Sequence, residues 1–193
     1  MDEVTENDKF TLLTSEGLNF SYIGDGRNYV EESFRNLIAA QLKIPTGEQI
    51  ATLVDYVYDG KLAKNPRSRF IKEEILGKHG LHVFNVNIFS PKGSKNHGVY
   101  VVNDITILDE GRFLDLNPLE KALDEGSVEG RVRFSRDRKI AFAGYETFQR
   151  NHQKGGDWSN NGFVIAHFGL EGAKKLNQLA SKLPEPAIIQ TIY

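Results

Sequence analysis

The sequence contains no cysteine, one tryptophan and one methionine in 193 residues. The lack of cysteine excludes disulfides, thiol nucleophiles, iron–sulfur clusters and cysteine-ligated zinc. No apolar run approaches the roughly 20 residues of a membrane span, so no membrane partner is expected. The first ten residues are acidic and polar and do not resemble a signal peptide, and we therefore expect a cytoplasmic protein.

The common catalytic and nucleotide-binding motifs are also missing. There is no glycine-rich phosphate loop, no HExxH, no GxSxG and no EF-hand pattern. His79 and His82 come closest to a metal-ligand spacing, but Gly80 interrupts the pair, and we predict neither a metal site nor a cofactor. Whole enzyme classes are thereby excluded, although a site assembled from distant residues stays possible.

The residues that are present predict an α+β fold, and a single domain is what a chain of this length usually forms. Short runs rich in aromatic and β-branched residues predict an antiparallel or mixed sheet. The strands are expected within residues 10–23, 81–89, 98–108, 130–143 and 162–168. Three to five helices are expected to cover it, at residues 29–43, 46–59 and 170–182, with shorter ones after Pro66 and Asn117. The domain is expected to span 1–193, with residues 1–9 flexible and 184–193 as a C-terminal tail.

The residue patterns are clearest in two of these elements. Thr46 and Gln49 form a capping box before an apolar stripe, which is typical of the start of a helix. In the strand 81–89, side chains alternate between the two faces, and the more apolar face excludes Asn85 and Asn87. Both asparagines are therefore expected to face solvent or a functional site.

Charge alternates in blocks along the chain although the formal net charge is only −2. The net charge is −7 over residues 1–60, +6 over 61–100, −6 over 101–130 and +4 over 131–158. Such blocks either pair within the fold or form a bipolar surface that meets a partner. We favour internal pairing.

The most basic short segment is 131–139, a predicted hairpin with five cations: Arg131, Arg133, Arg136, Arg138 and Lys139. A cationic hairpin of this kind can follow a phosphate backbone, and the basic segment 61–78 would extend its surface. The alternative, which we favour, is that these side chains pair with the acidic segment 104–129 that precedes them.

The irregular segment 152–161 contains the only tryptophan, Trp158, on a polar, glycine-containing stretch. It predicts either a recognition loop or a core anchor. His152, Asp157 and His167 are the candidate acid–base groups of an enzyme. His167 lies at the end of the strand predicted for 162–168, where Phe163 and Ile165 share its face and favour a packed histidine instead.

One family resemblance covers about residues 45–180. The segments HVFNVNIFSPKG, GVYVVND, RVRFS and GFVIAHFGLEGAKKL resemble a set of uncharacterised prokaryotic proteins, which we expect to be archaeal. Those proteins carry a V-F-N-x-N segment followed by a G-V-Y-V-V segment. The resemblance implies no chemistry and no site residues.

Three functions are consistent with the sequence. The first is a non-enzymatic macromolecule-binding protein that uses segments 61–78 and 131–139 and the Trp158 loop, with nucleic acid as the first partner and protein as the second. The second is an enzyme for a small or phosphorylated substrate. The third is a structural or assembly subunit with an apolar patch near the tail 184–193.

Overall fold

The chain is described by a computed structural model. It describes residues 10–14, 17–22, 30–58, 64–76, 83, 85–104, 115–148 and 157–181. Within them, no helix combines the length and the apolar character that crossing a bilayer requires.

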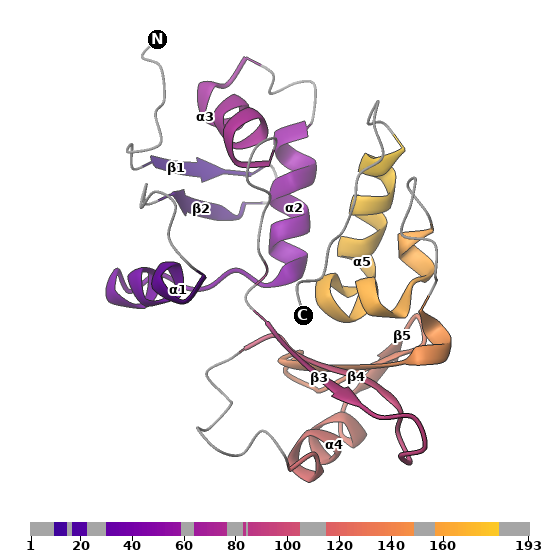
Figure 1. The fold of residues 1–193 in the computed structure, drawn as a ribbon. Helices are drawn as coiled ribbons and strands as arrows, with labels where there is room; N and C mark the ends of the chain where they lie inside the picture. The colour runs from indigo at the N-terminus through magenta and orange to yellow at the C-terminus, as the bar shows by residue number, and fades with distance from the viewer. Residues whose placement is uncertain are drawn as a thin grey trace.

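A five-stranded antiparallel sheet with strand order β3-β4-β7-β6-β5 forms the lower part of the molecule (Figure 1). In that order the strands span Val86–Ser90, Gly98–Val102, Ile140–Gly144, Val132–Phe134 and Ser127–Glu129. Helix α4 (Asn117–Asp124) contacts one face of the sheet, and helix α5 (Gly162–Ala180) contacts the other. The predicted α+β class and the antiparallel sheet are confirmed.

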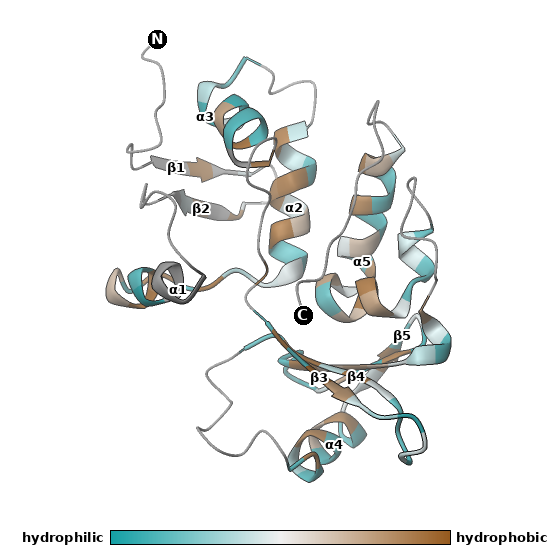
Figure 2. Ribbon diagram, viewed as in Figure 1, coloured by the Kyte–Doolittle hydropathy of each residue, from teal (hydrophilic) through white to brown (hydrophobic). Residues whose placement is uncertain are grey.

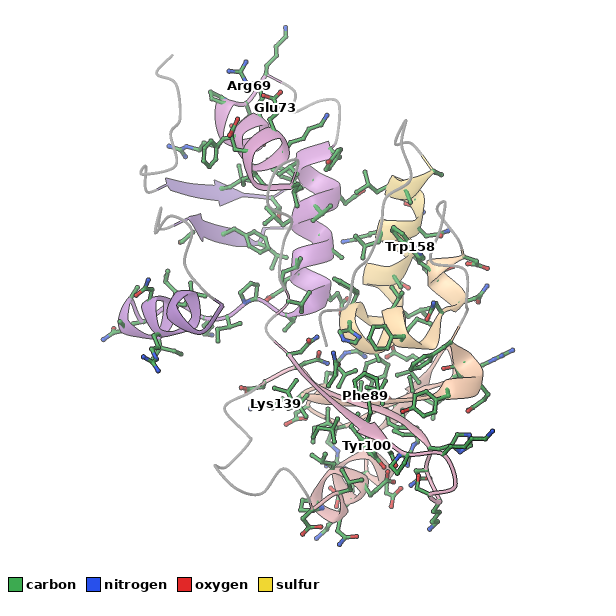
Figure 3. All side chains as sticks on the ribbon, in the orientation of Figure 1. Arg69, Glu73, Phe89, Tyr100, Lys139 and Trp158 are labelled. Carbon is green, nitrogen blue, oxygen red and sulfur yellow. The ribbon has the colours of Figure 1, made fainter. Side chains whose placement is uncertain are left out.

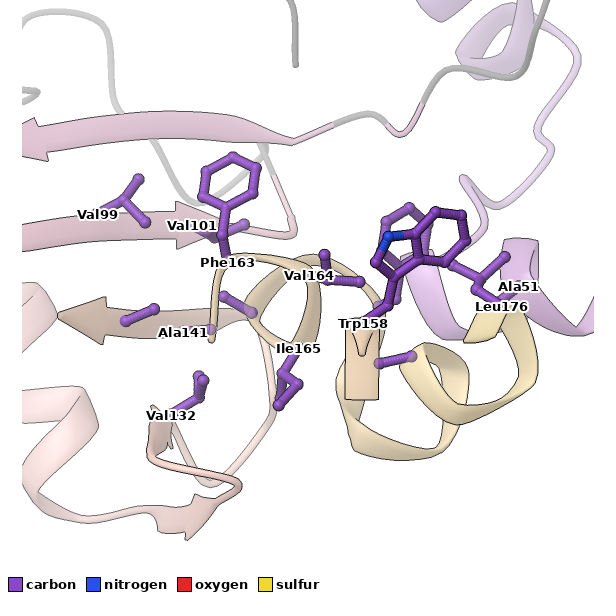
Figure 4. Packing of buried hydrophobic residues seen from close by; sticks show 14 of the residues in the cluster. Ala51, Val99, Val101, Val132, Ala141, Trp158, Phe163, Val164, Ile165 and Leu176 are labelled. Atoms are coloured by element: carbon purple, nitrogen blue, oxygen red, sulfur yellow. The ribbon is translucent and has the colours of Figure 1, made fainter. Parts of the chain in front are cut away.

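Helix α2 (Gly47–Tyr58) packs along α5 and forms a third layer. Its capping box is present, because the Thr46 amide donates to Gln49 Oε1 at 2.9 Å and the Gln49 amide donates to Thr46 Oγ1 at 3.3 Å. Figure 2 shows hydrophobic residues alternating with polar ones along α2. The largest core cluster lies between α2, α5 and the sheet, as Figure 4 shows for Ala51, Val101 and Ile165.

The strand predicted for 162–168 was wrong, because these residues form the first two turns of α5. Asn161 caps the helix by accepting a hydrogen bond from the Phe163 amide at 3.0 Å. The segment is buried on every side between the sheet and α2, so it lacks a polar face that would reveal a helical period. A short, wholly apolar run does not distinguish a buried strand from a buried helix.

The N-terminal strands and the segment after α2 pack against the C-terminal half of α2, at Leu53 and Val57. Strands β1 (Phe10–Leu13) and β2 (Asn19–Tyr22) pair with each other and not with the main sheet, contrary to our expectation of one sheet. They pack with helix α3 (Pro66–Phe70), which continues as the π-helix η2 (Ile71–Leu76). Helix α1 (Val30–Ala39) completes this part.

Candidate functional site

Arg133 is held inside the fold by carboxylates of α4. Its Nη2 atom lies 3.0 Å from Glu120 Oε2, and its Nη1 atom lies 3.5 Å from Asp124 Oδ1. Tyr100, a residue that is only 1 % exposed, also donates a hydrogen bond from its hydroxyl to Glu120. Burial and the Glu120 carboxylate both raise the pKa of Tyr100. Arg133 therefore stabilises the α4–sheet interface and is not available to a phosphate backbone.

Arg138 and Lys139 are paired in the same way at the β6–β7 turn. Arg138 Nη1 lies 2.5 Å from Glu129 Oε1, and its Nη2 lies 3.9 Å from Glu48 Oε2 at the start of α2. Lys139 Nζ lies 2.8 Å from Asp104 Oδ2. Hydrogen bonds to Glu129 and Asp104 raise the pKa values of Arg138 and Lys139 respectively. Three of the five cations thus make the internal pairs that the charge blocks favoured.

Arg131 and Arg136 differ from these three, because both are exposed and neither has an ion pair within the described residues. Arg131 stands at the tip of the β5–β6 hairpin, in a two-residue turn closed by the pair Glu129–Val132. Both turn residues have positive φ, 52° at Gly130 and 69° at Arg131. Such a turn favours glycine or asparagine. Arginine here costs conformational energy, and its side chain makes no ion pair or hydrogen bond with the described residues in return.

Two further exposed cations lie at the same end of the sheet as Arg131. Lys92 and Lys95 occupy the β3–β4 turn, and neither has an ion pair in the part of the chain that the structure describes. The register places this turn beside the end of β7 at Gly144, and Val132 pairs next to it. Three strand spacings separate the two turn centres, which is about 14 Å. We call Lys92, Lys95 and Arg131 the cationic edge.

The described part of the basic segment 61–78 lies far from the β6–β7 turn, as Figure 3 shows for Arg69 and Lys139. Lys72 stacks on the Tyr58 ring at the end of α2, whereas Arg138 reaches Glu48 at its start. Ten residues of helix separate the two contacts, about 15 Å. The expectation that segments 61–78 and 131–139 form one continuous surface is therefore not supported.

Trp158 is 5 % exposed and belongs to the main core cluster. Figure 4 shows its indole near Val164 and Leu176 of α5. Its backbone amide donates to Asn177 Oδ1 at 3.1 Å. The tryptophan thus anchors the 3-10 turn Trp158–Asn160 against α5, which leaves little of its side chain for a partner.

The two candidate acid–base groups that the structure describes, Asp157 and His167, differ in their surroundings, since Asp157 is exposed and His167 is buried. Asp157 is exposed and accepts hydrogen bonds from Ser159 and Asn160, which lower the pKa of its carboxyl. It adjoins Trp158, whose backbone amide donates to Asn177, on the other side of the Gly169 kink from His167. His152, like His79 and His82, lies outside the described residues.

His167 is 7 % exposed, and its Nδ1 atom lies 2.8 Å from the Phe163 carbonyl oxygen. Because a carbonyl only accepts, Nδ1 carries the proton and Nε2 keeps its lone pair. Burial lowers the pKa of His167 to about 4, so the ring is neutral at pH 7. Its Nε2 atom is buried and makes no hydrogen bond.

Three asparagines share the side of the sheet that α5 covers. Asn87 pairs with Val101, a core residue. Asn85 precedes Val86 and Asn103 follows Val102, and these two valines form the last pair at that end of the β3–β4 ladder. Asn103 donates to the Ala166 carbonyl, next to His167, at 3.4 Å. Asn85 Nδ2, Asn87 Oδ1 and Asn103 Oδ1 are buried without a hydrogen-bond partner. The expectation that Asn85 and Asn87 face a site stays a prediction, but they lie on the covered face.

No three histidine, aspartate or glutamate side chains gather as metal ligands among the described residues. No family model, no curated protein and no solved structure matches the chain. The resemblance to uncharacterised prokaryotic proteins therefore stays a prediction, and function has to be argued from this chain.

Proposed function

We propose that the protein is a non-enzymatic nucleic-acid-binding protein and that the cationic edge is its contact surface. The observation that carries the proposal is Arg131, whose strained backbone and unpaired side chain have no role inside the described fold. Strained residues of this kind concentrate at functional positions. This surface replaces the whole 131–139 hairpin, since Arg133, Arg138 and Lys139 are engaged by carboxylates.

The local charge supports this choice. Among the described residues of these turns and the adjoining strand ends, Lys92, Lys95 and Arg131 lie with two carboxylates, Glu129 and Glu146. Glu129 is already neutralised by Arg138 at 2.5 Å. A net positive edge remains, and its about 14 Å span is long enough to contact several successive phosphates of one strand.

The test is binding of a labelled RNA or DNA oligonucleotide followed by fluorescence anisotropy over a range of salt concentrations. We expect affinity to fall as salt rises, because neutralised phosphates release counterions. The double variant Lys92→Ala/Lys95→Ala should lower the slope of log K against log salt by about one to two. The matched control is Lys43→Ala/Lys121→Ala, which removes the same charge from exposed positions elsewhere.

Glu146→Gln provides a gain-of-function arm, because it removes the exposed carboxylate from the edge and should tighten binding. The proposal is wrong if no salt-dependent binding occurs, or if the control double variant weakens binding as much as Lys92→Ala/Lys95→Ala does.

A further inference from the structure

The cationic edge contains an aromatic pair between its two turns. Tyr145 directly follows β7, which lies between the strands that carry the two cationic turns. Its ring centroid is 6.0 Å from that of His97, an exposed residue of the β3–β4 turn. The Tyr145 amide also donates to the His97 carbonyl at 3.4 Å. Lys92, Lys95, His97, Tyr145 and Arg131 thus follow one another along the edge.

The Tyr145 ring is supported from the core side. Phe148 contacts it edge-on, with centroids 5.4 Å apart, and Phe163 contacts Phe148 in the same manner at 5.2 Å. These contacts fix the ring while leaving Tyr145 half-buried. A ring that is already held in place loses little conformational freedom when a ligand stacks on it.

We infer that the cationic edge is specific for single-stranded nucleic acid, with Tyr145 and His97 as a stacking platform for an unpaired base. This inference rests on the proposed function and adds the class of ligand. Cations that hold a backbone on both sides of an aromatic ring are the arrangement by which proteins bind single strands without reading sequence. In a duplex the bases are stacked on one another, so the ring would have no base face to meet.

The experiment compares three probes of similar charge: a single-stranded oligoadenylate of about 12 nucleotides, within the usual site size, a duplex RNA, and inorganic polyphosphate, which has no bases. We expect the single strand to bind more tightly than the other two by at least about fivefold, which is the lower end of what one stacked base contributes. Tyr145→Leu should remove this difference and leave polyphosphate binding unchanged. Tyr145→Phe keeps the ring and should retain the preference.

The outcomes separate this inference from the proposed function. If all three probes bind equally and Lys92→Ala/Lys95→Ala weakens each, the edge binds polyanions and the single-strand inference is overturned. Equal loss of every probe in Tyr145→Leu, with loss also in Tyr145→Phe, overturns it too, because the residue then only shapes the turn. If no probe binds, the proposed function fails with it.

Discussion

Arg131 and Arg138 both adopt a left-handed backbone, with φ of 69° and 59°, but carboxylates of the described fold hold only Arg138. The Arg138 guanidinium also stacks on the Phe134 ring at 4.6 Å. One strained arginine therefore joins α2, β5 and β6, while the other projects into solvent.

This contrast predicts that substitution by asparagine has opposite effects on stability at the two positions. Arg131→Asn should be neutral or raise stability by up to about 1 kcal/mol, because asparagine tolerates positive φ. Arg138→Asn relieves the same backbone strain but loses two partly exposed ion pairs and a cation–π contact. Their loss should lower the free energy of unfolding by about 1–2 kcal/mol. Its unfolding midpoint should thus lie several degrees below that of Arg131→Asn. Thermal denaturation of the two variants measures the difference, and equal midpoints would contradict the role given to Arg138.

The hydrogen-bond network around Glu120 predicts that substitutions of Glu120 and Tyr100 have non-additive effects on stability. Glu120→Ala leaves the buried Tyr100 hydroxyl without its acceptor and should cost about 2–3 kcal/mol. Tyr100→Phe removes the same bond without leaving an unpaired group, so about 1 kcal/mol is expected. In the double variant the unpaired hydroxyl is gone, and the cost should be smaller than the sum of the two single costs. Urea denaturation tests this cycle; strict additivity would show that the two side chains act independently.

His167 predicts a dependence of stability on acidic pH. Its folded pKa of about 4 lies below the unfolded value of about 6.5, so the unfolded chain binds the proton more readily between these pH values. The stabilising contribution is complete above pH of about 6.5 and is lost as pH falls towards 4, by about 3 kcal/mol. On acidification the wild type should therefore lose unfolding free energy relative to His167→Leu, which has no ring to protonate. Parallel curves would mean that His167 is not buried as a neutral ring.

The fluorescence of Trp158 provides a test of where the binding surface lies. As the only tryptophan, buried against α5, it should give a blue-shifted emission that acrylamide quenches weakly. Oligonucleotide binding at the cationic edge should leave this emission unchanged. Strong quenching on binding would instead place the Trp158 loop in the interface, as one of the initial hypotheses held.

Sequence reasoning succeeded where a local signal was sufficient. Thr46 and Gln49 marked the start of α2, and the alternating charge blocks indicated the pairs that Arg133, Arg138 and Lys139 make. It failed for residues 162–168, where burial on all sides removed the helical period. Strand β5 was missed for another reason. It has three residues, and Val128 between Ser127 and Glu129 is too short a pattern to predict pairing with β6.

The candidate site was only partly predictable. The individual cations and the asparagines were visible in the sequence, but strand order decides which of them meet. Lys95 and Arg131 are 36 positions apart, and the antiparallel register of β4, β7 and β6 brings their turns to one end of the sheet. No local pattern contains that information.

Gly169 interrupts α5 with a φ of 70° and a ψ of 167°, a conformation that is almost exclusive to glycine. The turns before it contact the sheet, where Gly162 adjoins Ala143, and also α2, where Gly47 lies against the His167 carbonyl; after it, Gly172 adjoins Ala51 of α2. A Cβ at Gly169 would also crowd Arg138 and Glu48, each 3.1 Å away. Gly169 therefore bends α5 while both of its halves stay in contact with α2. A side chain here would strain the backbone and crowd Arg138 and Glu48, so one substitution would disturb both the bend of α5 and the link between α2 and the β6–β7 turn.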